Sequence, residues 1–159
     1  MSAPVFALTF VTALGCALAA GVFYAFSSFV MAGLDRRSPA TAVGAMQGIN
    51  VTAVRPPLML PLFGTAPLCL AVAVLALLDF DGARSWFALA GAAIYLIGIV
   101  GVTMLGNVPL NERIDRVDPD GPTAAEEWRR YYGPWCALNH VRTVSGLAAT
   151  AGMIAALTA

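Results

Sequence analysis

Four runs of apolar residues, separated by three polar stretches, set the pattern of this sequence. The runs cover residues 5–31, 58–78, 86–106 and 135–157. Each run can form a helix that crosses the hydrocarbon core of a bilayer, which takes roughly 20 residues. The runs do not alternate between apolar and polar residues as the strands of a membrane barrel do. The pattern therefore predicts an all-α fold, with four transmembrane helices in a single integral membrane domain over residues 1–159.

The composition agrees with a lipid environment. The chain has 159 residues, of which 59% are hydrophobic and 11% charged, whereas soluble domains carry about 25% charged residues. Nine basic residues, all arginine, balance nine acidic residues. This balance leaves no basic surface of the kind that binds nucleic acid. The three cysteines form no CxxC pair, and we interpret them as free thiols.

The two long loops also carry helix signals. The segment 38–56 opens with a Ser-Pro pair, which suits a helix N-terminus, and closes at a proline. The segment 123–134 opens with a capping box, Thr123 followed by Glu126, and closes with a Gly-Pro pair. We therefore predict a short amphipathic helix in each loop, and we expect the second to end before the fourth span begins.

The arginines predict the orientation. Among the nine, only Arg84 lies in the short second loop, and the others lie in or beside the first and third loops. Cytoplasmic loops of membrane proteins carry the excess of Lys and Arg. We therefore expect a multi-pass protein of the cell membrane, with both termini outside and the two long loops in the cytoplasm.

On this topology, polar and aromatic side chains converge at the cytoplasmic end of the bundle. Polar groups are costly in lipid unless they find partners or line a cavity. A pocket with apolar walls and a few polar groups suits a small hydrophobic molecule. The candidate residues of this pocket are Tyr24, Asn50, Arg55, Asn107, Asn111, Trp128, Trp135, Asn139, His140 and Arg142.

Each candidate residue also has a structural interpretation, which the sequence leaves open. Asn107 and Asn111 can bond neighbouring helices, and Arg142 can extend to the lipid headgroups. The aromatic residues can form a belt at the membrane surface. We assign no metal ligands, because a single histidine allows neither a bis-histidine haem nor a multi-histidine copper site in one protomer. No glycine-rich phosphate loop and no nucleophile elbow occurs.

Four sequence blocks carry a resemblance to a known family. They are GVFYAFSSFVMAGL at 21–34, AMQGIN at 45–50, GNVPLNERID at 106–115 and WRRYYGPWCALNHVRT at 128–143. In this order they resemble the DUF1772 family of small membrane proteins, which includes the anthrone oxygenases. The resemblance implies a four-helix membrane oxygenase that converts an anthrone, or a related aromatic polyketide, to a quinone with O2. It also implies that the reaction needs no bound metal or flavin.

That chemistry suggests roles for the candidate residues. We predict His140 as general base, because imidazole titrates near neutral pH. Arg142, with Arg55, would stabilise developing negative charge. The amides of Asn107, Asn111 and Asn139 would donate hydrogen bonds to the substrate's oxygens, and Asn50 and the aromatic side chains, Tyr24, Trp128 and Trp135, would bind it.

The spacing along the fourth span separates these roles. Asn139 and His140 are adjacent, so on a helix their side chains point about 100° apart. Asn139 and Arg142 are three residues apart and share a face. We therefore expect Asn139 and Arg142 to line the pocket, with His140 at its edge.

Two other functions stay open at this point. The first is a membrane protein that binds a quinone or another hydrophobic aromatic metabolite without transforming it. The second is a scaffold or transporter component in which the amides only join helices. The expected partners are an aromatic small molecule, O2 and the lipid bilayer, and the sequence leaves a homo-oligomer open.

Overall fold

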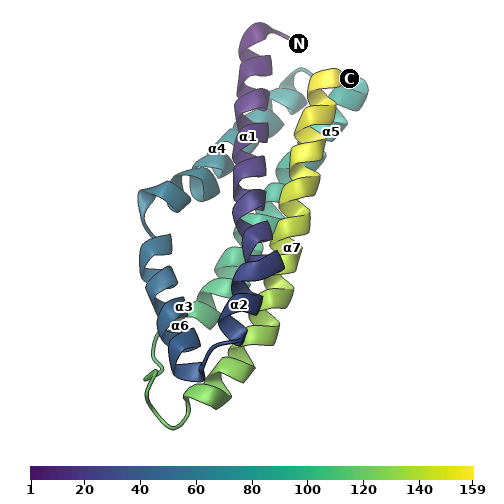
Figure 1. The fold of residues 1–159 in the computed structure, drawn as a ribbon. Coiled ribbons are helices and arrows are strands. Elements are labelled where there is room, and N and C mark those ends of the chain that lie inside the picture. Colours follow the sequence, from purple (N-terminus) through teal and green to yellow (C-terminus); the bar gives the residue numbers. More distant parts are fainter.

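The structure is a computed structural model that describes all 159 residues, and it consists of helices joined by short loops (Figure 1). Four long helices run over Ala3–Asp35, Pro56–Leu78, Gly82–Ile114 and Ala124–Thr158. Each is long and apolar enough to cross a membrane. A fifth helix, α3 (Pro39–Ala53), lies between the first two. The predicted all-α fold with four candidate membrane spans is therefore confirmed, and the chain is a multi-pass membrane protein.

Two of the four long helices contain π-helical turns. The first consists of α1 (Ala3–Ala25), η1 (Phe26–Val30) and α2 (Met31–Asp35), and the third of α5 (Gly82–Tyr95), η2 (Leu96–Gly101), η3 (Thr103–Asn107) and α6 (Val108–Ile114). The other two are α4 (Pro56–Leu78) and α7 (Ala124–Thr158). A π-turn widens the hydrogen-bonding ring by one residue and often occurs at a functional site. No residue pattern predicted these turns.

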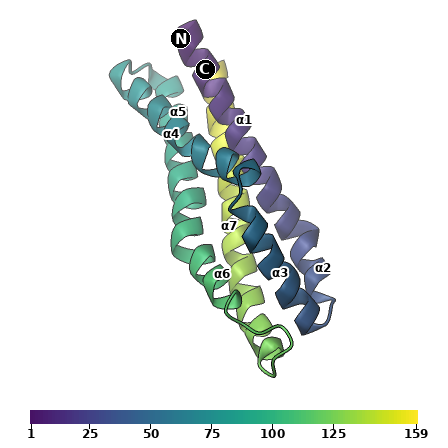
Figure 2. The ribbon, with the colours of Figure 1, turned by 90° about the vertical axis from the view of Figure 1, so that its left-hand side faces the viewer.

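The helices divide the bundle into two halves along its length. In Figures 1 and 2, α1 and α7 run beside each other, and the α4–α5 turn lies near both termini. Helix α3 lies in the other half, beside α2 and α6, and an elbow at Val54 and Arg55 joins it to α4 near mid-height. The 35 residues of α7 span roughly 50 Å at 1.5 Å per residue. This length exceeds the roughly 30 Å hydrocarbon core, so α7 reaches well beyond it.

Each half has its own apolar core. The half with the termini is filled by side chains of α1, α4, α5, η2 and α7, among them Tyr95, Ile99 and Met153. The other half is built around two side chains of α7, Trp128 and Trp135. The candidate site described below lies where the two cores meet.

Helix α4 contains two prolines, Pro61 and Pro67, within its span. A proline inside a helix removes a backbone hydrogen bond and crowds the preceding turn, and neighbouring helices of membrane proteins supply replacement bonds. The hydroxyl of Tyr95 in α5 donates to the carbonyl oxygens of Pro61 at 3.2 Å and of Leu62 at 2.8 Å. Tyr95 therefore ties the irregular part of α4 to α5.

The short helix expected in the first loop is confirmed, with Ser38 as its N-cap. Its hydroxyl accepts from the backbone N–H of Thr41 at 3.3 Å. The prediction of a separate helix in the third loop is wrong, because α7 continues through Pro134. The ring of Pro134 lies on the exposed side of α7, where the helix tolerates it. The capping box is also wrong, since Thr123 has helical dihedral angles and its side chain caps nothing.

Candidate functional site

Asn139 in α7 lies at the centre of a hydrogen-bond network that joins α7 to the first long helix. Its Nδ2 donates to the carbonyl oxygen of Phe23 at 2.8 Å and to Oγ of Ser27 at 2.7 Å. Its Oδ1 accepts from Nη2 of Arg142 at 2.8 Å. A carbonyl only accepts and a guanidinium only donates, so one orientation of the amide satisfies both partners. The structure thus brings Asn139 and Arg142 together on one buried face of α7.

Arg142 is a buried cation that has no carboxylate partner. It is 5% exposed and takes part in none of the five salt bridges of the chain. Its Cζ lies 4.2 Å from the ring centre of Phe23 and 5.3 Å from that of Trp135. These cation–π contacts offset part of the desolvation cost.

One guanidinium nitrogen of Arg142 has no partner at all. Nη1 makes a long hydrogen bond of 3.4 Å to Oγ1 of Thr103, whereas the buried Nε donates to nothing. A buried donor without an acceptor is uncommon in folded proteins and calls for an explanation. The arrangement leaves Arg142 able to donate to an oxygen atom of a bound molecule.

A small pocket of about 70 Å³ lies beside Arg142, next to the elbow between α3 and α4. Apolar side chains form most of its walls, and Asn50 and Arg142 are its polar lining residues. The complete lining is Val22, Phe23, Phe26, Met46, Ile49, Asn50, Ala53, Leu58, Trp135 and Arg142. One cation and one amide among aromatic and aliphatic walls suit a flat organic molecule that carries an oxygen.

The two asparagines of the third long helix fix one wall of this pocket. Oδ1 of Asn111 accepts from Nε1 of Trp135 at 2.8 Å and from the hydroxyl of Tyr131 at 3.0 Å. Nδ2 of Asn107 donates to the carbonyl oxygen of Trp135 at 3.3 Å, and its buried Oδ1 has no partner. Neither asparagine lines the pocket itself. Both asparagines hold Trp135 of α7 in place. They therefore bond neighbouring helices, which is one of the two interpretations that the sequence left open.

Helix α3 is fastened over the pocket by two amide side chains. Nδ2 of Asn50 donates to Oδ1 of Asp115 at 2.8 Å. Nε2 of Gln47 donates to the carbonyl oxygens of Ile114 at 2.9 Å and Val117 at 2.8 Å. All three partners lie at or just after the end of α6, so these bonds close the pocket on the side of α3.

Seven of the ten predicted site residues do not line the pocket. Asn107 and Asn111 bond Trp135, and Asn139, which we expected in the lining, bonds Arg142 from behind it.

The other four lie elsewhere. Tyr24 is 59% exposed, and Arg55 is an exposed residue at the elbow. Trp128 is buried away from the pocket, where its Nε1 donates to Oδ1 of Asp35 at 2.9 Å. His140 is exposed, and its Nδ1 lies 2.9 Å from Oγ of Ser27.

Sequence reasoning did not assign site roles to two hydroxyl residues on helices other than α7 that contact this network. Ser27 bonds Asn139, and Thr103 bonds Arg142. Both lie in π-helical turns, Ser27 in η1 and Thr103 in η3. Because a π-turn shifts the register of a helix face by one residue, the 3.6-residue period does not show which side chains face α7.

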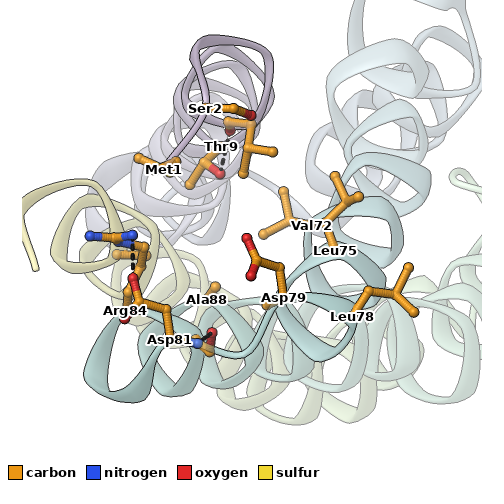
Figure 3. Close-up of a pocket in the computed structure, with 14 residues that line it drawn as sticks. Met1, Ser2, Thr9, Val72, Leu75, Leu78, Asp79, Asp81, Arg84 and Ala88 are labelled. Atoms are coloured by element: carbon orange, nitrogen blue, oxygen red, sulfur yellow. Dashed lines mark hydrogen bonds and ion pairs between the residues drawn. The ribbon is translucent and has the colours of Figure 1, made fainter.

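A larger pocket of about 230 Å³ lies at the opposite end of the bundle, between the start of α1 and the α4–α5 turn (Figure 3). Among its polar residues, Thr9 and Ser85 form internal hydrogen bonds, and Arg84 pairs with Asp81. The carboxylate of Asp79 points into the pocket in Figure 3 and makes no hydrogen bond. The one arginine of this pocket is paired with a carboxylate. This pocket is therefore less suited to bind an anion than the pocket beside Arg142.

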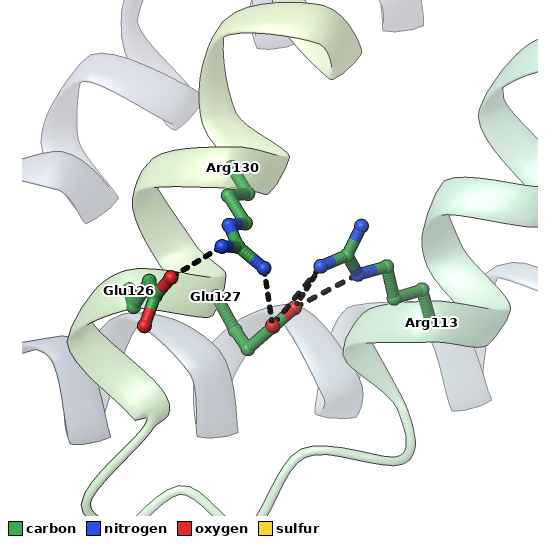
Figure 4. A network of polar contacts seen from close by, with 4 residues as sticks. All are labelled: Arg113, Glu126, Glu127 and Arg130. Atoms are coloured by element: carbon green, nitrogen blue, oxygen red, sulfur yellow. Dashed lines mark hydrogen bonds and ion pairs between the residues drawn. The ribbon is translucent and has the colours of Figure 1, made fainter.

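The remaining charged cluster joins the end of α6 to the start of α7 (Figure 4). Nε and Nη2 of Arg113 donate to the carboxylate of Glu127 at 2.8 and 3.0 Å, and Arg130 bridges Glu127 and Glu126. Arg113, Glu126 and Arg130 are more than half exposed, whereas the shared Glu127 is 19% exposed. The pair of Arg130 with Glu126 is therefore worth little, and the bidentate bond of Arg113 to Glu127 is the stronger part of the network. No group of three His, Cys, Asp or Glu side chains lies close enough together to hold a metal ion.

In a comparison with known protein families, residues 58–152 match the family model described as anthrone oxygenase. This stretch covers α4 to most of α7 and includes Asn107, Asn111, Asn139 and Arg142. No curated protein and no solved structure matches the chain. The family match covers more than half of the 159 residues. The chain therefore belongs to the anthrone oxygenase family.

Proposed function

We propose that this protein binds an anthrone-type aromatic ketone beside Arg142 and oxidises it to a quinone with O2, without a bound cofactor. The main support is the guanidinium of Arg142, which is buried without a carboxylate and lies against aromatic pocket walls. Such a cation favours a ligand that becomes negatively charged during the reaction. Membership of the anthrone oxygenase family supports the substrate class.

The proposed reaction uses one O2 and releases one water. Loss of a proton from the CH2 between the two aromatic rings of an anthrone gives an enolate. The enolate passes one electron to O2, and the carbon radical and superoxide combine to form a peroxide at the same carbon. After protonation, this carbon loses its second hydrogen while the O–O bond breaks. Water leaves, a second ketone forms, and all four electrons that reduce O2 come from the substrate.

In this scheme Arg142 stabilises the enolate oxygen. Each 1.4 kcal/mol or so of stabilisation of the conjugate base lowers the pKa of the substrate CH2 by about one unit. Asn139 orients the guanidinium through the hydrogen bond between its Oδ1 and Nη2. Phe23 and Trp135 hold the flat rings, and Asn111 fixes the plane of the Trp135 indole through Nε1. His140 lies outside the pocket, so we propose that the substrate proton passes to water at the rim.

Binding of a tricyclic ligand requires the pocket to widen. The present volume of about 70 Å³ is far below the roughly 300–1,000 Å³ of typical ligand pockets. Helix α3 is the wall best suited to move, because it is a short separate helix with an elbow at one end. Its movement would break the amide bonds of Gln47 and Asn50 and loosen the apolar contacts of Val43 and Met46. We propose that α3 swings away to admit the substrate and then closes over it.

The test is turnover of an anthrone by the purified protein in lipid nanodiscs, without added metal or reductant. O2 consumption and quinone absorbance are recorded together and should agree in a ratio of one to one. Arg142→Met should lower kcat by roughly 10²–10³, the usual loss when a group that stabilises an oxyanion is removed. Arg142→Lys keeps the charge but not the geometry and should fall between Arg142→Met and the parent.

A matched control addresses the second pocket. Asp79→Asn removes the one free carboxylate that points into the larger pocket, and it should leave kcat unchanged. A large loss with Asp79→Asn and none with Arg142→Met would move the reaction to the opposite end of the bundle. Absence of turnover by the parent protein would refute the oxygenase proposal.

One observation favours a second function, binding without catalysis. The pocket beside Arg142 has no acidic, histidine, cysteine or tyrosine side chain in its lining, so it contains no evident general base. A binding protein would be stabilised against heat by a quinone or an anthrone, by an amount that rises with ligand concentration, and would form no product. The same preparation measured with and without O2 separates the two functions.

A further inference from the structure

We propose that Ser27 is a positioning residue for Arg142 and acts through the amide of Asn139. This inference rests on the proposed function, since it concerns the cation that stabilises the substrate's oxygen. Ser27 lies in η1, and its Oγ is the one side-chain atom that contacts three polar residues of α7. It lies 2.7 Å from Nδ2 of Asn139, 3.0 Å from Oγ1 of Thr143 and 2.9 Å from Nδ1 of His140.

The number of hydrogens limits how these contacts can be made. A hydroxyl has one hydrogen to donate and two lone pairs to accept with. Nδ2 of Asn139 can only donate, so one lone pair of Ser27 is always used by that amide. Oγ1 of Thr143 donates its one hydrogen to the carbonyl oxygen of Asn139 at 2.9 Å, so Ser27 donates to Oγ1 of Thr143 and accepts from Nδ1 of His140. In this arrangement Ser27 accepts from Asn139 and His140 and donates to Thr143, so its hydrogen and both lone pairs are used.

The bond between Ser27 and Asn139 decides where the other end of the amide points. With its two hydrogens directed at Ser27 and at the carbonyl of Phe23, Asn139 has only Oδ1 free to face Arg142. Oδ1 then holds Nη2 and so fixes the direction of the guanidinium beside the pocket. Without the hydroxyl of Ser27, the amide loses one of two anchors, and the guanidinium loses its fixed direction.

The chain offers a matched control in the next residue. Ser28 lies in the same π-turn, but its Oγ donates to the carbonyl oxygens of Tyr24 at 2.7 Å and Ala25 at 3.3 Å within its own helix. Ser28→Ala therefore removes the same hydroxyl from the same turn without touching α7. Ser27→Thr keeps a hydroxyl at position 27 and serves as the conservative variant.

The first experiment compares anthrone oxidation by Ser27→Ala, Ser27→Thr and Ser28→Ala. Loss of one hydrogen bond that orients a charged group is expected to lower kcat about tenfold. KM should stay within about twofold, because the aromatic walls that hold the rings are intact. Ser27→Thr should recover most of the activity, and Ser28→Ala should match the parent. Equal kcat for Ser27→Ala and Ser28→Ala would overturn the role of Ser27.

The second experiment does not depend on catalysis. A hydroxyanthraquinone dye absorbs at longer wavelength when its phenol is ionised, so its spectrum reports whether the site stabilises the phenolate. The dye bound to the parent and to Ser28→Ala should ionise at lower pH than the dye bound to Ser27→Ala. If the parent binds ionised dye but oxidises no anthrone, the oxygenase proposal fails. The ionisation of the dye in the Ser27 and Ser28 variants still tests whether Ser27 positions Arg142.

A replacement variant and two outcomes of the dye experiment complete the test. If Ser27→Ala does not fold, Ser27→Cys replaces it, because a thiol has nearly the size of the hydroxyl but accepts hydrogen bonds poorly. Ionisation of the dye at the same pH in the Ser27 and Ser28 variants would overturn the proposal. A parent protein that does not favour the ionised dye would overturn it too, because Arg142 would then not act on an anionic oxygen.

Discussion

Substitution of Gly146 by alanine tests whether the close contact of α7 with α1 positions the site. Gly146 follows Arg142 by one helical turn and faces α1 and η2. A Cβ added to Gly146 would lie 2.7 Å from Cβ of Ala20, 3.1 Å from its Cα and 3.1 Å from Cδ1 of Ile99. Neither atom of Ala20 can move by a change of rotamer, so one of the helices must shift.

The size of the effect follows from two opposing terms. Carbon atoms in contact normally lie about 3.5–4.0 Å apart, so the added methyl group is about 1 Å too close to Ala20. Overpacking of this kind costs typically about 1–3 kcal/mol. Alanine is favoured over glycine within a helix by about 1 kcal/mol, which offsets part of that cost. We expect Gly146→Ala to lower the free energy of unfolding by about 1 kcal/mol.

Gly21→Ala is the control that isolates the packing term. Gly21 is the neighbour of Ala20 in α1, and a Cβ added there meets no atom within 4 Å. Both variants gain the same helix preference, so the difference between them is the overpacking cost alone, about 1–3 kcal/mol. Unfolding by SDS in mixed micelles, followed by circular dichroism, measures both variants. Equal midpoints would show that α1 and α7 are not in rigid contact at Gly146.

Three other substitutions address separate parts of the structure. Tyr95→Phe removes the hydroxyl that bonds two carbonyls of α4 and should cost about 1 kcal/mol in the same SDS titration; an unchanged midpoint would show that water or lipid replaces it. Glu127→Gln removes the half-buried charge that Arg113 and Arg130 share and should lower stability by about 1 kcal/mol, with a smaller effect in high salt. Gln47→Leu should raise hydrogen exchange in α3 but not in α5. Unchanged exchange in α3 would mean that other contacts hold it in place.

The fold class could be predicted from the sequence because lipid permits few structures. Four apolar runs with few charges leave little choice besides helices. The ends of the helices were harder to predict. Polar residues at 107–114 continue the third long helix as η3 and α6, since they pack on α3 and α7 rather than facing lipid. Pro134 was expected to end a helix, yet its ring lies outward and α7 continues.

The candidate site could be predicted only in part. The three-residue spacing of Asn139 and Arg142 indicated a shared face, and the two side chains are hydrogen-bonded. Asn107 and Asn111 are four residues apart and therefore share a helix face, but this spacing does not show that the face meets Trp135 rather than a pocket. Spacing reports which residues of one helix lie together, whereas the partner depends on how the helices are packed.

The elbow between α3 and α4 places the pocket beside Arg142 at a junction of helices within the bundle. Planar ring compounds dissolve in hydrocarbon in preference to water. For such a compound, the quantity that governs occupancy is the number of molecules per lipid, and the molarity of the bulk solution matters little. The same dose therefore loads the protein heavily in a lipid-poor preparation and sparsely in a lipid-rich one.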